Sequence, residues 1–174
     1  MPTALNSLNT LLVHELRDLY SAETQLLEAL PQMAQVATHD ELKQAFNEHE
    51  SQTRQQIERL RDIFDRLGES PEGEHCEAME GLIEEGQEII EQQGDAVVKD
   101  AALIAAAQRA EHYEIAGYGT ARTYANELGM TEAANLLDET LSEEKNTDER
   151  LTKLATGGWL SSGINEEARQ RTQR

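Results

Sequence analysis

Several glutamates and one histidine interrupt apolar stripes that repeat at helical spacing. The segment "RAEHYEIAGYGT", residues 109–120, places Glu111 and Glu114 soon after the apolar run "AALIAAA". A carboxylate that faces a protein interior must be paired, protonated or bound to a metal, because an isolated buried charge is too costly. Carboxylate and imidazole groups are suitable ligands for manganese and iron. The chemistry to consider is therefore that of a carboxylate-rich metal site.

The same interruption occurs near the middle of four separate stripes. In the first stripe, Glu23 stands between Leu19 and Leu26. The other stripes carry inward polar positions at His49, Thr53 and Gln56, at Glu111 and Glu114, and at Thr140, Glu144 and Thr147. In an antiparallel bundle the middles of the helices lie at one level. We therefore predict that five side chains converge there as metal ligands: Glu23, His49, Glu111, Glu114 and Glu144.

Two explanations of these glutamates stay open. Each carboxylate would cost roughly several kcal/mol to desolvate in a dry core, and two divalent iron or manganese ions would neutralise four of them. Alternatively, Glu111 or Glu114 extends into solvent or pairs with Arg17 or Arg54. An evolutionary remnant of a metal site would show the same pattern.

The elements that position these residues are predicted to be helices. Leu, Ala, Glu and Gln dominate, and the alternation typical of strands is absent. The apolar periodicity predicts long helices near residues 5–37, 40–67, 96–128 and 131–155, with a shorter amphipathic helix near 77–92. Thr38 or Asp40 is a candidate cap for the second long helix.

The connections predict how the helices are arranged. Tight turns near 38–40 and 129–131 indicate two antiparallel hairpins, and about thirty residues between the hairpins are enough to cross the length of a bundle. This organisation predicts an all-α, ferritin-like four-helix bundle with a short crossover helix over residues 1–158. Residues 159–174 are predicted to form a loose polar tail.

Other residues that bear functional groups have simpler interpretations. His14, His39 and His75 lack ligand spacing and are predicted to lie at the surface. His112 lies on the opposite side of its turn and is predicted to be a surface or packing histidine. Tyr20 and Tyr113 can reach the carboxylate layer, although packing is the preferred role for Tyr113. Gly117 and Gly119 are predicted to allow close approach of helices.

Composition excludes several classes of partner. Thirty-four acidic residues against 15 basic ones give a net charge of −19, which repels phosphate backbones and anionic lipids. We therefore expect no nucleic-acid or membrane partner. Cys76 is the single cysteine, so an intramolecular disulfide and a cysteine-based zinc site are excluded. No apolar run approaches the roughly 18 residues of a membrane span, which predicts a cytoplasmic protein.

Three segments resemble the YciE/YciF family of ferritin-like proteins. They read "LRDLYSAETQLLEALPQM", "AMEGLIEEGQEII" and "DAALIAAAQRAEHYEIAGYGTA…LG…EEKNTDERL", and the similarity covers roughly residues 5–155. The resemblance implies a ferritin-like bundle, often dimeric, that is associated with bacterial stress responses. It also implies a dinuclear metal site like those of rubrerythrin-related proteins.

The ligand pattern implied by the resemblance is incomplete in this chain. Ferritin-like di-iron proteins pair a glutamate on one helix with Glu-x-x-His on the next. Glu111 and Glu144 fit this pattern, with Glu114 as an additional carboxylate, but Thr147 replaces the histidine. In the first hairpin, Thr53 and Gln56 occupy the Glu-x-x-His positions, and "HESQT" stands where the family reads close to "HLEET". A mononuclear or empty site is therefore an alternative to a dinuclear one.

These observations lead to a functional hypothesis and its rivals. The hypothesis is a stress-related protein with an iron or manganese site that reacts with oxygen or peroxide, without an organic cofactor. The first rival is a non-catalytic bundle that keeps its polar layer for structural specificity and acts through its acidic surface or a dimer face. Iron storage in a cage is a third interpretation. The alanine-rich stripes and the crossover helix predict a homodimer.

Overall fold

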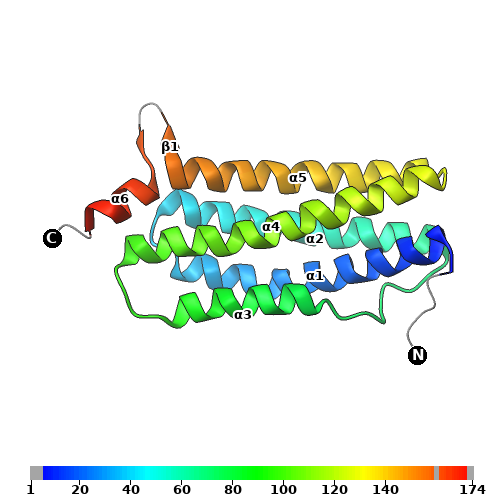
Figure 1. Ribbon diagram of the computed structural model, residues 1–174, viewed down its shortest axis with the longest axis horizontal. Coiled ribbons are helices and arrows are strands. Elements are labelled where there is room, and N and C mark those ends of the chain that lie inside the picture. The colour runs from blue at the N-terminus through cyan, green and yellow to red at the C-terminus, as the bar shows by residue number, and fades with distance from the viewer. Residues whose placement is uncertain (1–5, 159–160, 172–174) are drawn as a thin grey trace.

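The computed structural model describes residues 6–158 and 161–171, which form a helical bundle (Figure 1). Its helices are α1 (Leu8–Val36), α2 (Asp40–Leu67), α3 (Glu77–Glu91), α4 (Ala96–Glu127), α5 (Thr131–Thr156) and α6 (Ile164–Arg171). The predicted all-α class and the five predicted helices are confirmed, with bounds close to those expected. Residue 5, where the first helix was expected to begin, lies outside the described residues.

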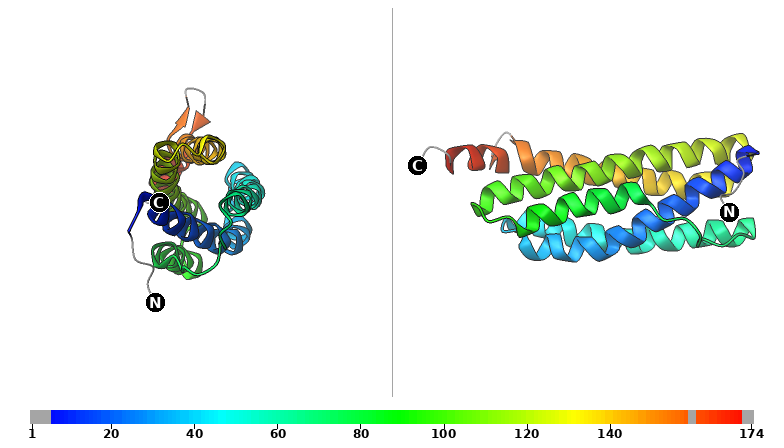
Figure 2. Two further views of the ribbon diagram at one scale, coloured as in Figure 1. Left: turned by 90° about the vertical axis from the view of Figure 1, so that its right-hand side faces the viewer. Right: turned by 60° about the horizontal axis from the view of Figure 1, so that its bottom comes forward.

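The four long helices form two antiparallel hairpins, α1–α2 and α4–α5 (Figure 1). The end-on view in Figure 2 shows α3 outside this group of four. There α3 packs against both α1 and α4 and carries the chain back along the bundle between the hairpins. The ferritin-like arrangement with a crossover helix is therefore confirmed.

The core is divided into two apolar clusters along the bundle. One contains Leu26, Leu30 and Phe46, and the other contains Leu16 and Leu60. Between them lie buried polar residues of all four long helices: Glu23, His49, Thr53, Gln56, Glu111, Glu114, Thr140, Glu144 and Thr147. The apolar clusters hold the helices together on either side of this polar layer. In the described ranges, the helices are all too short or too polar to cross a membrane.

The predicted cap of α2 is wrong. The residue before α2 is His39, whose side chain caps nothing, and neither Thr38 nor Asp40 caps this helix. Thr38 instead donates its backbone N–H and its hydroxyl to the carboxylate of Asp100, at 2.9 and 2.7 Å. The His39 N–H donates to the same carboxylate at 2.8 Å. Asp100 thus anchors the α1–α2 turn to α4, and these charge-assisted hydrogen bonds replace a local cap.

The prediction of a loose C-terminal tail also needs correction. Gly157–Gly158 (β1) pairs antiparallel with Ser161–Ser162 (β2), and α6 then packs against α4 and α5. Ile164 is buried in the core, which explains how a polar segment is held in place. Gly163 allows the chain after β2 to pass close to the end of α5, because a Cβ at this position would collide with the backbone of Gly157. Residues 159–160 and 172–174 lie outside the described residues.

Close helix packing at Gly117 is confirmed, and it gives a matched test. A Cβ at Gly117 would lie 2.7 Å from Leu19 Cδ2, and Leu19 is fully buried. A Cβ at Gly119 would have no heavy atom within 4 Å among the described neighbours, so the same role for Gly119 is wrong.

We expect Gly117→Ala to lower the free energy of unfolding by about 1 kcal/mol, because overpacking outweighs the gain in helix propensity. Gly119→Ala is expected to raise it by about 0.5–1 kcal/mol through propensity alone. Denaturant unfolding measures both changes. Equal effects of the two substitutions would contradict the close α1–α4 contact.

Candidate metal centre

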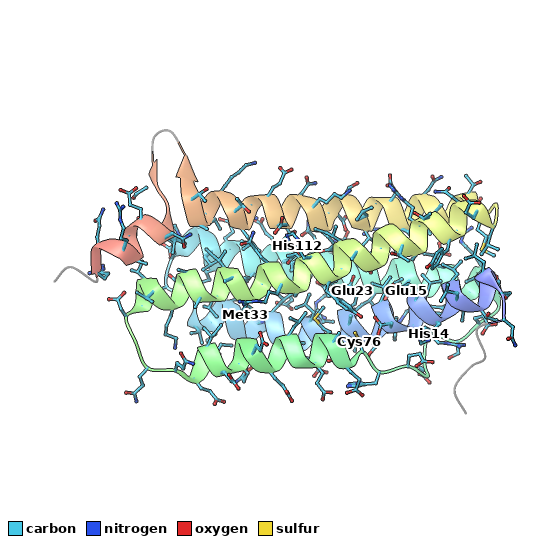
Figure 3. The ribbon with its side chains drawn as sticks, in the orientation of Figure 1. His14, Glu15, Glu23, Met33, Cys76 and His112 are labelled. Carbon is cyan, nitrogen blue, oxygen red and sulfur yellow. The ribbon has the colours of Figure 1, made fainter. Side chains whose placement is uncertain are left out.

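Each of the four long helices contributes to one buried cluster at mid-bundle. Glu23 comes from α1, His49 from α2, Glu111 and Glu114 from α4, and Glu144 from α5. None of these five residues is more than 2% exposed. Figure 3 shows Glu23 near the middle of the bundle, between the ribbons of α1 and α4. All five residues predicted from the sequence are thus buried in the core, and their role as metal ligands stays a prediction.

Four of the five residues form a compact group of donor atoms. One such atom from each of His49, Glu111, Glu114 and Glu144 lies within 4.8 Å of those from the other three. His49 Nε2 is 3.1 Å from Glu111 Oε1 and 3.9 Å from Glu144 Oε2. These contacts lack hydrogen-bond geometry, and neither ring nitrogen of His49 has another partner. The imidazole and three carboxylates therefore face a common point.

Many of the carboxylate oxygens in this layer have no hydrogen-bond partner. Both oxygens of Glu114 are unpaired, as is one oxygen each of Glu23, Glu111 and Glu144. Unpaired buried carboxylate oxygens are costly, and coordination by a cation satisfies them. The donor chemistry of the cluster, oxygen with one imidazole nitrogen, fits a divalent ion such as manganese or iron.

Basic side chains do not neutralise the cluster. In the part of the chain that the structure describes, Arg17 pairs with Glu69 at 2.9 Å and Arg54 pairs with Glu50 at 2.6 Å. Arg59, which donates to Thr140 Oγ1 at 3.3 Å, pairs with Glu139 and Glu143 of α5. The alternative in which Arg17 or Arg54 pairs with Glu111 or Glu114 is therefore excluded.

Glu23 lies beside the compact group and is held by Tyr118. The Tyr118 hydroxyl, buried on α4, donates to Glu23 Oε1, while Glu23 Oε2 stays unpaired. Tyr118 is not among the residues predicted from the sequence. Its position one helical turn after Glu114 is a signal that could have found it, because residues four apart share a face of a helix.

Neutral side chains occupy the positions that the family resemblance assigns to the remaining ligands. Gln56 Nε2 donates to Glu144 Oε1, and also to Glu143 Oε2 at 3.1 Å. Thr53 Oγ1 is buried without a partner. Thr147 Oγ1 donates to the backbone carbonyl of Glu143 at 3.1 Å. The polar layer is therefore rich in metal ligands on the side of α4 and α5 and poorer on the side of α2.

The two tyrosines that the sequence suggested do not hydrogen-bond to the site glutamates. The Tyr113 hydroxyl donates to Asp18 Oδ2 at 2.5 Å and accepts from Cys76 Sγ at 3.1 Å. This network helps to anchor the start of α3. The Tyr20 hydroxyl accepts from Arg61 at 3.0 Å.

The remaining histidines lie away from the cluster. His112, which is labelled in Figure 3, has an exposed side chain. Its Nε2 lies 3.3 Å from Asp148 Oδ1. His14 and His75 lie at the surface near acidic partners, as expected. His39 is half-buried at the start of α2 rather than fully at the surface.

Burial favours the protonated form of the cluster carboxyls when no metal is bound. It raises the pKa of Glu111 to about 8 and raises the pKa values of Glu23, Glu114 and Glu144 well above the usual range. Neighbouring carboxylates raise the pKa values of Glu23 and Glu114 further, through Glu144 acting on Glu23 and Glu23 acting on Glu114. The pKa of Glu111 is instead lowered in part by its hydrogen bond with Glu144. Burial also raises the pKa of Tyr118, which keeps its hydroxyl protonated.

These shifts predict that the metal-free protein becomes less stable as pH rises. Between the unfolded pKa of 4.5 and the folded pKa of about 8, Glu111 keeps a proton that the unfolded chain releases. The free energy of unfolding therefore falls with pH in this window, by up to about 1.4 kcal/mol per pH unit for each such proton. Thermal melts in chelator between pH 5 and 8 measure the slope. Glu111→Gln cannot titrate and should reduce it; an unchanged slope would contradict the assignment.

The fold and the buried site together define a class: ferritin-like four-helix bundles with a carboxylate–histidine cluster in the core. The family described as "Domain of unknown function (DUF892)" matches residues 7–169. Protein YciF of Escherichia coli strain K12 is 49% identical over 156 residues, which covers 87% of this chain and 92% of YciF. The chain therefore belongs to the DUF892 family and is similar to YciF.

Solved structures agree with this assignment. The crystal structure of the E. coli stress protein YciF has a TM-score of 0.83 at 48% identity, covering 86% of this chain and 94% of YciF. YcfI of Rhodopseudomonas palustris has a TM-score of 0.85 at 42% identity, with 89% and 99% covered. A protein of Xanthomonas campestris pv. campestris shares the fold alone, with a TM-score of 0.74 at 21% identity and coverage of 96% and 99%.

Proposed function

We propose that this protein is a stress-response protein that binds iron or manganese in the core of its bundle. The observation that carries the proposal is the cluster of His49, Glu111, Glu114 and Glu144, which is buried, has unpaired oxygens and makes no ion pair with a described lysine or arginine. The link to stress comes from YciF, which is described as a stress protein and is 48% identical in its crystal structure.

The donor set favours one ion over two. The compact group supplies one imidazole and three carboxylates to a single point. Beside it, Glu23 is engaged by Tyr118, and Gln56 and Thr53 contribute neutral groups where a second ion would need charged ones. One divalent ion balances only part of the negative charge of four carboxylates. Glu23 is suited to keeping a proton, because burial and the neighbouring Glu144 raise its pKa well above the usual range, although the hydrogen bond from Tyr118 acts in the opposite direction.

A bound iron or manganese ion would supply one-electron redox chemistry toward oxygen or peroxide. The chain contributes the surroundings of that ion. The two apolar clusters on either side of the polar layer exclude bulk water. Tyr118 holds a proton at its hydroxyl and orients Glu23, while Gln56 orients Glu144. Hydrogen bonds from neighbouring side chains to metal ligands hold those ligands in a binding geometry.

A second candidate function is a non-catalytic bundle that acts through an acidic surface or a dimer face. It is favoured by the hydrogen bond from Gln56 to Glu144, because a neutral amide satisfies one site carboxylate without a metal. In this case the polar layer serves to specify helix register.

We also propose that the protein forms a homodimer. Light scattering at micromolar concentration, in low and in high salt, measures the mass of the particle in solution. A monomer mass in both salt conditions would contradict the homodimer.

Titration of the metal-free protein with Mn²⁺, and with Fe²⁺ without oxygen, tests the proposal. We expect saturable binding of one ion per chain and a rise of the melting temperature that grows with metal concentration, because the ion binds the folded state. Mg²⁺ provides a control, since it lacks the affinity of transition metals for imidazole. Absence of saturable Mn²⁺ and Fe²⁺ binding would favour the non-catalytic bundle.

A further inference from the structure

A small cavity lies beneath α3, and Glu111 of the cluster forms part of its wall. The cavity is about 30 Å³ in volume and is bounded by α1, α3 and α4. Figure 2 shows α3 lying along α1 and α4, and residues of these three helices line the cavity. Leu82 and Ile83 on the α3 side are partly exposed, whereas Ala106, Ala107 and Glu111 on the α4 side are buried. The cavity thus lies between α3 and the face of α4 that carries Glu111.

Small residues create the cavity, and its lining is apolar. Alanines of α4 and Gly86 of α3 leave the space, and larger aliphatic side chains such as Leu30 complete the wall. Among the residues that the structure describes around it, only Gln87 and Glu111 bring polar side chains. A bound water needs two to four polar partners, and small apolar cavities stay dry while accepting apolar guests such as xenon. The cavity therefore favours a small apolar guest over water.

Its position connects it to the proposed metal centre. Glu111 lines the cavity, and its Oε1 lies 3.1 Å from His49 Nε2 in the cluster. Glu111 Oε2 is buried without a partner. A guest in the cavity would therefore be close to a ligand of the ion.

We propose that this cavity admits a small apolar molecule of the size of dioxygen to the metal centre. The inference rests on the proposed function for its metal, but the cavity itself can be tested without one. It gives the alanine-rich face of α4 a role beyond close packing, because larger side chains there would fill the route.

Xenon is the probe for the cavity, and two glycines of α3 give matched variants. A Cβ at Gly86 would meet Ala106 Cβ at 3.9 Å, an ordinary contact, so the side chain of Gly86→Leu can extend into the cavity. A Cβ at Gly81 would have no heavy atom within 4 Å among the described neighbours, so Gly81→Leu makes the same change away from it. Both substitutions replace a helical glycine and therefore favour the helix.

Crystals of the metal-free protein under xenon pressure should show xenon beside Glu111 in the wild type and in Gly81→Leu. We expect loss of this xenon in Gly86→Leu. Ile83→Ala, which enlarges the cavity, should increase xenon occupancy and provides a second test if Gly86→Leu does not fold. An ordered water in place of xenon, or xenon retained beside Glu111 in a folded Gly86→Leu, would overturn the proposal.

The second readout is the binding rate of nitric oxide, an apolar diatomic similar in size to dioxygen, to the Fe²⁺-loaded protein. We expect Gly86→Leu to slow this rate by about tenfold or more and Gly81→Leu to leave it unchanged, with Fe²⁺ affinity equal in all three proteins. Equal rates in the two variants would show that the route is wrong. If no metal binds, the proposed function fails, whereas the xenon result still decides whether the cavity admits an apolar guest.

Discussion

Glu114→Ala and Glu144→Ala are each expected to abolish measurable binding of Mn²⁺ and Fe²⁺. Both side chains belong to the compact group of donors, and Glu114 has no other partner for either oxygen. Residues that only hydrogen-bond to metal ligands already contribute about 10- to 100-fold in affinity, so loss of a direct ligand should weaken binding by more than about 100-fold. Calorimetric titration of the metal-free proteins, with metal content as a cross-check, measures the effect.

The control for this prediction is Glu149→Ala. Glu149 lies on α5, as Glu144 does, but its side chain is 70% exposed. The substitution Glu149→Ala also replaces a glutamate with alanine but leaves the cluster untouched. The metal affinity of this variant should therefore equal that of the wild type. A similar loss in Glu149→Ala would mean that metal binding follows overall negative charge and not the buried site.

The second large effect is a gain in the stability of the metal-free protein. We expect Glu114→Met to stabilise the metal-free protein by about 1–4 kcal/mol, because replacing buried ionic groups with apolar residues of similar volume often does so. Glu114 is completely buried with both oxygens unpaired, and burial together with Glu23 raises its pKa. The melting temperature in chelator should rise by about 2–4 °C for each kcal/mol.

Metal addition separates this effect from a general stabilisation. Mn²⁺ should raise the melting temperature of the wild type and leave that of Glu114→Met unchanged. Glu127→Met, an exposed position at the end of α4, should show neither the gain in chelator nor the loss of the metal response. A lower stability of Glu114→Met in chelator would show that the carboxyl is satisfied in the metal-free protein.

Periodicity was enough to predict the bundle, because Leu16, Leu19, Leu26 and Leu30 recur on one face of a helix and equivalent stripes occur three more times.

Rules that use only neighbouring residues failed where a residue distant in the sequence supplied the hydrogen-bond partner. Asp100 takes the hydrogen bonds of Thr38 and of the His39 N–H from 62 and 61 positions away, so the helix-capping rule could not find it. The C-terminal helix was missed because one buried residue, Ile164, holds a segment that is otherwise polar.

The burial of the cluster residues was also predictable from periodicity. A glutamate between Leu19 and Leu26 must face the same way as its neighbours, and the middles of antiparallel helices meet. The sequence could not show which of the five residues form the compact group, since this depends on side-chain conformations. Nor could it show that Tyr118 would engage Glu23 or that Gln56 would reach Glu144. These contacts join α4 to α1 and α2 to α5.

The most direct test of a metal centre in this bundle is the metal content of the protein purified without chelators from cells supplied with iron and manganese. Elemental analysis of the wild type and of Glu144→Ala in parallel gives the number of ions per chain. The proposed function predicts about one iron or manganese ion per wild-type chain, in keeping with the single compact group of donors, and none in Glu144→Ala. Wild-type protein that contains no metal and takes up none on addition of Mn²⁺ or Fe²⁺ would contradict it.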